Sequence, residues 1–271
     1  TSGTHTVPAT GCTLDKVITP GSWESSESEK IMTIQGGSDK NNLHELVAAK
    51  DSRHFQINKA HTLHLSYVKL TCRSSRHGGI NTWGNVYIKG VHFDGYYDDT
   101  TQNADFGGAI YVVKDGAAPQ LIISDSMFEN EKAKKQGGAI YAMGVGTNVS
   151  ISSSMFKSNR ATKNSGGGNL AGGAIYASGG VELTVADTTF ASNLGKGGGA
   201  VALKSTDASS NPTRGDFTSC TFESNTATYL ENGTPNKNGG GIYSENSPIT
   251  LKSSNFTANG AFDGGGMYVE F

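Results

Sequence analysis

The chain has 271 residues, a net charge of −2, and 37 glycines against only 6 prolines. So much glycine without a G-X-Y period excludes collagen, and hydrophobic residues at 35% in regular runs exclude a disordered chain. No Lys/Arg cluster supports nucleic-acid binding, and no apolar run is long enough to span a membrane.

Residues 1–22 match none of the patterns found further along the chain. We assign them to a cap, a linker or an assembly segment, and residues 23–271 to a single domain. The chain starts at Thr1 without an initiator Met, so we interpret it as a processed or trimmed product. Earlier coils with a weaker form of the later pattern are predicted at 31–37, 54–58 and 63–70.

From residue 78 onward the chain repeats two coupled motifs. The first is a glycine pair followed by small and apolar residues and usually a Tyr; its copies begin at Gly107, Gly137, Gly172, Gly198, Gly239 and Gly264. The second is Phe-x-x-Asn, at 156–159, 190–193, 222–225 and 256–259, with a shortened copy at 128–130 and a degenerate one at Phe93. The variable spacing between copies indicates coils of strand with inserted loops.

These repeats predict an all-β fold, a right-handed parallel β-helix of roughly nine to ten coils with loop insertions. Period-two alternation directs the Ile of each glycine motif inward. Stacked coils would place the Phe residues in an interior ladder and the Asn residues in an amide ladder at the following corner. Corner-forming residues stand three positions before each Phe.

The paired GGAI and Phe-x-x-Asn motifs resemble the repeats of the chlamydial polymorphic outer membrane proteins. The resemblance covers roughly residues 78–271 and extends back to about residue 30. It implies a pectin-lyase-like β-helix that is secreted or displayed on the extracellular surface, with an adhesive or structural role.

The tyrosines of the glycine motif follow an inward Ile and are therefore expected to point outward. They would form an external stripe, interrupted at Ala202, from Tyr111, Tyr141, Tyr176, Tyr243 and Tyr268. Two interpretations stay open: stacking between neighbouring coils, or a contact surface for a glycan or a cell-surface partner.

Many right-handed β-helices cleave polysaccharides, which requires converging carboxylates, or Ca²⁺ with a cationic base. The best candidates are Asp94, Asp98, Asp99 and Asp105, for which the sequence suggests no partnered Lys or Arg. We interpret them as a solvated loop, with a Ca²⁺ site as the alternative. All seven His precede residue 93 and are expected at the surface. We therefore predict no catalytic residues, no metal and no cofactor.

Three sequons, at Asn148, Asn232 and Asn255, would carry glycans if the source is eukaryotic. Among the three cysteines, Cys220 is expected to be a buried thiol, and Cys12 and Cys72 could form a disulfide if the N-terminal segment lies along the early coils.

The favoured function is a non-enzymatic structural or adhesive surface element, and a polysaccharide-acting enzyme is the alternative. The last coil starts at Gly264 and lacks a second strand. Head-to-tail self-association, through residues 1–22, is one expectation for this end; a capped monomer or a fragment is the other.

Overall fold

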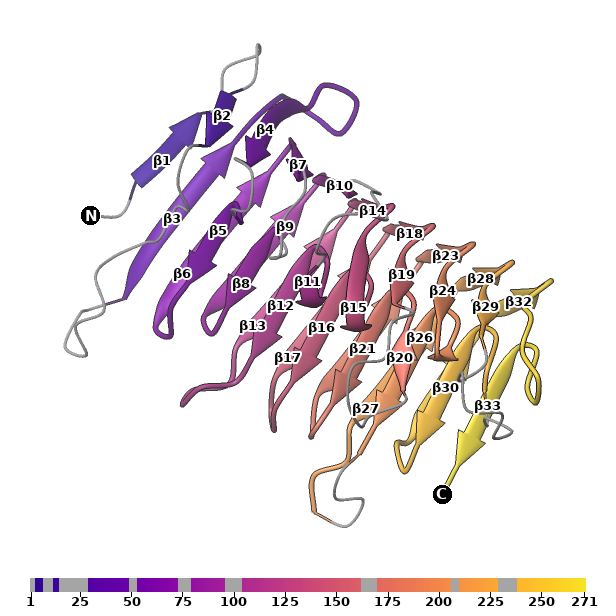
Figure 1. Cartoon of the computed structure of the whole chain (residues 1–271). Coiled ribbons are helices and arrows are strands. Elements are labelled where there is room, and N and C mark those ends of the chain that lie inside the picture. Colours follow the sequence, from indigo (N-terminus) through magenta and orange to yellow (C-terminus); the bar gives the residue numbers. More distant parts are fainter. Residues whose placement is uncertain are drawn as a thin grey trace.

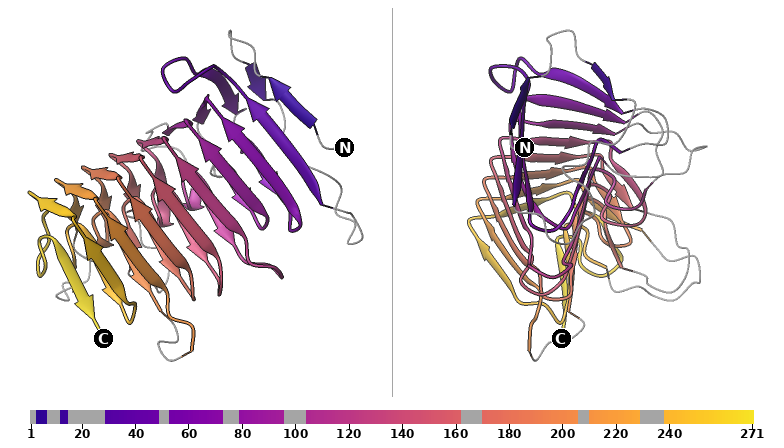
Figure 2. Two further views of the ribbon diagram at one scale, coloured as in Figure 1. Left: turned by 180° about the vertical axis from the view of Figure 1, so that it is seen from behind. Right: turned by 90° about the vertical axis from the view of Figure 1, so that its left-hand side faces the viewer.

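The chain winds into a stack of short strands, with the N-terminus at one end and the C-terminus at the other (Figures 1 and 2). Every named element in the described part of the chain is a strand, and no helix there is long and apolar enough to cross a membrane. The computed structural model describes residues 3–6, 12–14, 29–48, 53–72, 79–95, 104–161, 170–205, 210–228 and 238–271.

Sheet A runs the length of the stack, and its strands pair in parallel in chain order. Its nine strands are β1 (Gly3–Thr6), β3 (Lys30–Gln35), β6 (His61–Ser66), β9 (Asn85–Lys89), β13 (Gln120–Ser124), β17 (Asn148–Ser152), β22 (Glu182–Ala186), β27 (Arg214–Thr218) and β31 (Ile249–Lys252).

Sheet B follows sheet A in each coil and carries the Phe of the second motif. Its nine strands are β2 (Cys12–Leu14), β4 (His44–Ala48), β7 (Val68–Cys72), β10 (His92–Gly95), β14 (Met127–Glu129), β18 (Met155–Lys157), β23 (Thr189–Ala191), β28 (Thr221–Glu223) and β32 (Asn255–Thr257).

Sheet C closes each coil and carries the apolar part of the glycine motif. Its eight strands are β5 (Phe55–Ile57), β8 (Ile80–Thr82), β12 (Ile110–Val113), β16 (Ile140–Met143), β21 (Ile175–Ser178), β26 (Val201–Lys204), β30 (Ile242–Glu245) and β33 (Met267–Glu270).

Two smaller sheets lie between sheets B and C along the chain. Sheet D contains β11 (Ala104–Phe106), β15 (Lys132–Gln136), β19 (Arg160–Ala161), β24 (Leu194–Gly195) and β29 (Thr226–Ala227). Sheet E contains β20 (Ala171–Gly172) and β25 (Gly197–Gly198). Parallel pairing between successive coils confirms the predicted all-β, right-handed parallel β-helix.

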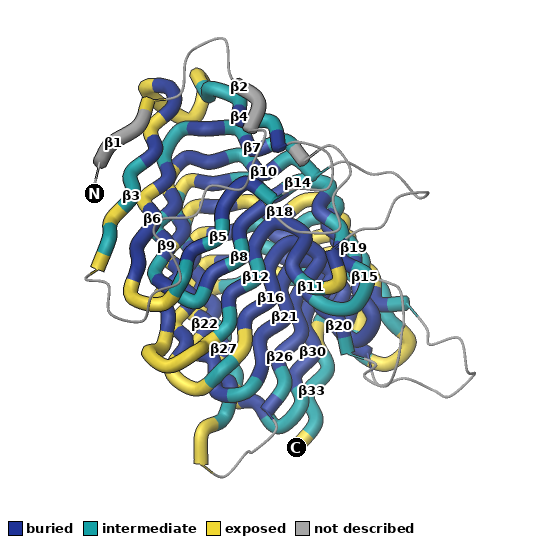
Figure 3. The backbone as a smooth tube through the Cα atoms, turned by 60° about the vertical axis from the view of Figure 1, so that its left-hand side comes forward, coloured by how far each residue is buried: buried dark blue, intermediate teal, exposed yellow. Residues whose placement is uncertain are grey.

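The interior is built from columns of equivalent side chains, and the backbone of buried residues is dark blue in Figure 3. The Ile column of sheet C is confirmed as inward, because its members are in register and fully buried. They are Ile80, Ile110, Ile140, Ile175, Val201 and Ile242, each 0% exposed.

The Phe ladder is also confirmed. Six rings stack face to face between coils, with centroids 4.5–5.0 Å apart, on Phe93, Phe128, Phe156, Phe190, Phe222 and Phe256. The corner before each Phe is left-handed, with φ of 47–61° at Gly90, Asp125, Ser153, Asp187, Ser219 and Ser253. Short polar residues and glycine tolerate this conformation best.

The second glycine of each pair is required by close packing between coils. A Cβ on Gly138 would lie 1.9 Å from the carbonyl oxygen of Gly173, and one on Gly173 would lie 2.1 Å from that of Gly199. Any larger residue would therefore push the coils apart.

The N-terminal segment differs from the expectation that it matches no coil. Strand β1 pairs in register with β3, and β2 pairs with β4, so both extend the stack. Its described strands therefore extend the β-helix at its N-terminal end. The pattern escaped notice because these strands are short and carry few apolar residues.

Candidate functional site

The predicted tyrosine stripe exists as a stack on the outward face of sheet C. The ring centroids of Tyr111 and Tyr141 are 5.2 Å apart, those of Tyr141 and Tyr176 are 5.4 Å apart, and those of Tyr243 and Tyr268 are 5.8 Å apart. In-register pairing places Ala202 between Tyr176 and Tyr243, as expected. Stacking between neighbouring coils is therefore observed.

Three members of the stripe are buried, and Tyr111 and Tyr268 are its partly exposed members. Tyr141, Tyr176 and Tyr243 are only 7%, 4% and 3% exposed. Phe106 and Leu170, which precede two of the glycine pairs, pack against this cluster. A period-two pattern assigns a side chain to a face but does not reveal whether another segment covers that face.

Chemical accessibility should separate the covered tyrosines from the others. Burial raises the pKa of Tyr141, Tyr176 and Tyr243, so both shielding and the scarcity of phenolate slow nitration. We expect tetranitromethane to modify the partly exposed Tyr268 well before these three, as followed by peptide mass spectrometry. Equal rates at all four positions would contradict the burial described here.

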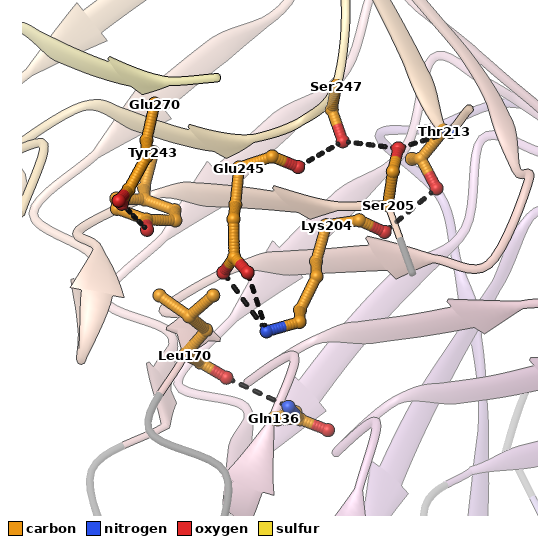
Figure 4. A network of polar contacts seen from close by, with 9 residues as sticks. All are labelled: Gln136, Leu170, Lys204, Ser205, Thr213, Tyr243, Glu245, Ser247 and Glu270. Atoms are coloured by element: carbon orange, nitrogen blue, oxygen red, sulfur yellow. Dashed lines mark hydrogen bonds and ion pairs between the residues drawn. The ribbon is translucent and has the colours of Figure 1, made fainter. Parts of the chain in front are cut away.

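A polar network borders the tyrosine stack (Figure 4). The Lys204 ammonium lies 2.9 and 3.0 Å from the two carboxylate oxygens of Glu245, on the next coil. The Tyr243 hydroxyl donates to Glu270 over 3.1 Å, and the Gln136 amide donates to the Leu170 carbonyl over 2.9 Å. Each of these groups is used to join neighbouring coils, so the network is structural.

The acidic loop does not form a converging carboxylate site among the described residues. Asp94 pairs with Lys69 at 2.8 Å, and Asp105 pairs with Lys135 at 3.0 Å. The expectation that these carboxylates have no cationic partners is therefore wrong. The partners come from neighbouring coils, so they are remote in sequence. Asp98 and Asp99 lie outside the described residues.

The histidines divide between surface and interior. His64 is exposed, as predicted, and stacks on Tyr87 with centroids 4.8 Å apart. His54 and His61 are buried, which corrects the expectation for them. Burial lowers the pKa of His54 to about 4, and its Nε2 lies 3.0 Å from the Leu46 carbonyl oxygen. No group of three or more His, Cys, Asp or Glu in the described ranges could hold a metal ion.

The cysteines do not converge. Cys220 is a buried free thiol, as expected, and burial raises its pKa. The register places Cys12 beside Leu46 and Cys72 beside Ala48, so strand β4 lies between the two cysteines. Two strand spacings amount to about 9.5 Å, and a disulfide spans Cα atoms less than about 7 Å apart. This register argues against the Cys12–Cys72 disulfide.

The amide ladder joins successive coils through side-chain hydrogen bonds. Asn193 Nδ2 donates to Asn225 Oδ1 and to the Phe156 carbonyl, both at 2.9 Å. Its Oδ1 accepts the backbone N–H and the side-chain amide of Asn159, both at 3.0 Å. Asn225 repeats the arrangement with Asn259. The ladder expected from the Phe-x-x-Asn motif is confirmed.

Glu131 holds the ladder position on the coil where the sequence suggested Asn130. Phe128 is in register with Phe156, and the Glu131 N–H donates to Asn159 Oδ1 over 3.0 Å, as Asn159 donates to Asn193. Asn130 instead occupies the left-handed corner, with φ of 59°. Glu131 is 4% exposed, and burial, aided by the charge of Asp94, raises its pKa to about 8.

A polar groove of about 360 Å³ runs along this corner, above the amide ladder. It crosses successive coils parallel to the helix axis, so strands far apart in the sequence line it together. Its lining includes Asn130, Glu131, Ser158, Arg160, Ser192 and Ser224. This groove was not predicted, although a Ser precedes three of the ladder residues, Asn159, Asn193 and Asn225, in the sequence.

The fold and its ladders define a β-solenoid of the right-handed parallel β-helix class. Residues 125–143 and 219–245 match the Chlamydia polymorphic membrane protein repeat. Each of these segments joins a Phe corner to the following glycine pair, so the chain carries repeats of this type. Searches of curated proteins and of solved structures found no match.

Proposed function

We propose that this protein is a non-catalytic structural and adhesive element of an extracellular surface. The observation that carries the proposal is the pair of continuous ladders, one of Phe rings and one of Asn amides, within a chain that has polymorphic membrane protein repeats. Side chains that stack or hydrogen-bond in such ladders hold each coil to the next, and a solenoid held in this way is a rigid rod. The family is named for membrane proteins, which supports a surface location.

The same geometry gives little support to a polysaccharide-cleaving enzyme. A glycosidase needs two carboxyl groups that flank the scissile bond, and a lyase of this fold needs Ca²⁺ together with a cationic base. Asp94 and Asp105 are each held by lysines, and neither lines the groove.

Antibody labelling of the source cells tests the proposed location. We expect equal labelling of intact and permeabilised cells, since the epitopes would already be outside. Labelling that appears only after permeabilisation would contradict a surface role. Release of reducing or unsaturated ends from uronate polymers by the purified chain would contradict a non-catalytic role.

Glycosylation remains a prediction that depends on a eukaryotic source. Asn148 and Asn255 are exposed, and Asn232 lies outside the described residues. Exposed sequons are accessible to modification. In that case the intact mass of native protein should fall after glycosidase treatment, whereas an unchanged mass would show that the sequons are unused.

A further inference from the structure

The serines that line the groove above the amide ladder differ in their hydrogen bonding from the serines of the interior column. Ser158, Ser192 and Ser224 repeat along it, one on each coil, with φ of 55–56°. Coils in a parallel sheet are spaced by about 4.8 Å, so the hydroxyls form an evenly spaced row.

These three hydroxyls have no hydrogen-bond partner among the described residues, although their backbone N–H groups all do. The serines of the interior column behave differently. The Ser126 and Ser154 hydroxyls each donate to a carbonyl two residues earlier over 2.7 Å. The groove serines therefore keep donors and acceptors available for a ligand.

The buried carboxyl of Glu131 is a second, independent feature of the groove. It lines one end, is 4% exposed, and has no hydrogen-bonding partner for its side chain within the described ranges. Buried polar groups are normally paired, so an unpaired one beside a groove indicates a missing polar partner.

The chemistry of the lining selects among ligand classes. A peptide adding as a strand would need free backbone groups, but the N–H groups of Ser158 and Ser192 are bonded to the next coil at 3.0 and 2.9 Å. Leu194 is the apolar side chain in a lining that is otherwise polar. A row of hydroxyls and amides at even spacing instead matches a polyhydroxylated chain with a similar repeat. The rise per sugar in an extended β-1,4-linked chain is close to the strand spacing.

We infer that this groove binds a linear β-1,4-linked polysaccharide, laid along the helix axis with successive sugars over successive coils. The inference rests on the proposed surface role and names the ligand class for its adhesive part. The groove binds the polysaccharide without cleaving it, so the sugar chain is chemically unchanged when it dissociates.

Matched double variants test the inference by calorimetric titration with cellohexaose. In Ser192→Asn/Ser224→Asn the larger side chains narrow the groove, while Asn tolerates the left-handed backbone. The control is Ser153→Asn/Ser219→Asn, which makes the same change at left-handed, exposed positions of the other corner. We expect cellohexaose to bind at least about ten-fold more weakly to the groove variant than to the wild type, a difference of about 1.4 kcal/mol. The control should bind like the wild type.

Chain length provides a second readout. Because the groove crosses several coils, cellohexaose should bind more tightly than cellobiose. No binding of either sugar, equal affinities for the two sugars, or equal weakening in both double variants would overturn the inference. Surface labelling of intact cells tests the surface role separately, so a failed titration beside positive labelling would remove only the groove assignment.

Discussion

Replacing Asn193 with Ala should destabilise the chain by at least about 3 kcal/mol, because several buried groups lose their partners together. The Phe156 carbonyl loses a donor, and the N–H and amide of Asn159 lose their acceptor. Each buried group left unpaired costs about 1–3 kcal/mol. Chemical denaturation of wild type and variant measures the difference.

The control for this experiment is Asn148→Ala, which removes an exposed amide from a strand of sheet A. We expect a change within about 0.5 kcal/mol. Asn193→Asp keeps the shape but, when ionised, turns a carboxylate oxygen toward the Phe156 carbonyl and Asn225 Oδ1. Its deficit against wild type should therefore shrink on acidification. Similar stabilities for Asn193→Ala and Asn148→Ala would show that the ladder contributes little.

The parts of the fold that could be predicted are those in which each coil repeats the same local pattern. Ile140 and Ile175 share a motif and a register, so one alternation places both inside. Phe156 and Phe190 likewise stack because their motifs are equivalent. Repetition makes such positions predictable, because an ambiguous assignment in one coil can be checked against the equivalent residues of the next coil.

What could not be predicted depends on contacts between unlike segments. Leu170, at the end of an insertion of irregular length, packs against the tyrosine cluster. The ion pair of Lys69 with Asp94 joins two coils whose alignment is weak in sequence. Periodicity describes one strand at a time. It therefore does not predict which inserted segment packs over the outer face of a sheet.

The groove was missed for a related reason. Ser192 and Ser224 were treated as spacers between Phe and Asn, although the structure lines them up as a row. Glu131 was overlooked because Asn130 resembled the ladder residue. Counting three positions from Phe128 instead of searching for an Asn identifies the ladder position correctly.

The charge state of Glu131 should make the stability of the chain depend on pH. Burial raises its pKa from 4.5 to about 8, so the folded chain holds this proton more tightly than the unfolded chain does. Burial disfavours the charged carboxylate, and the nearby negative charge of Asp94 disfavours it further, so the protonated form is the one that the folded chain accommodates.

The contribution of Glu131 is therefore complete below pH 4.5 and is lost as the pH rises toward about 8. Between these limits the free energy of unfolding should fall by up to about 1.4 kcal/mol per pH unit relative to Glu131→Gln, which cannot ionise. Urea denaturation of both proteins across this range measures the slope. Glu223→Gln, at an exposed position of sheet B, is the matched control and should follow the wild type. If Glu131→Gln also follows the wild type at every pH, then Glu131 is ionised in the folded chain and the ladder does not end in a neutral acid.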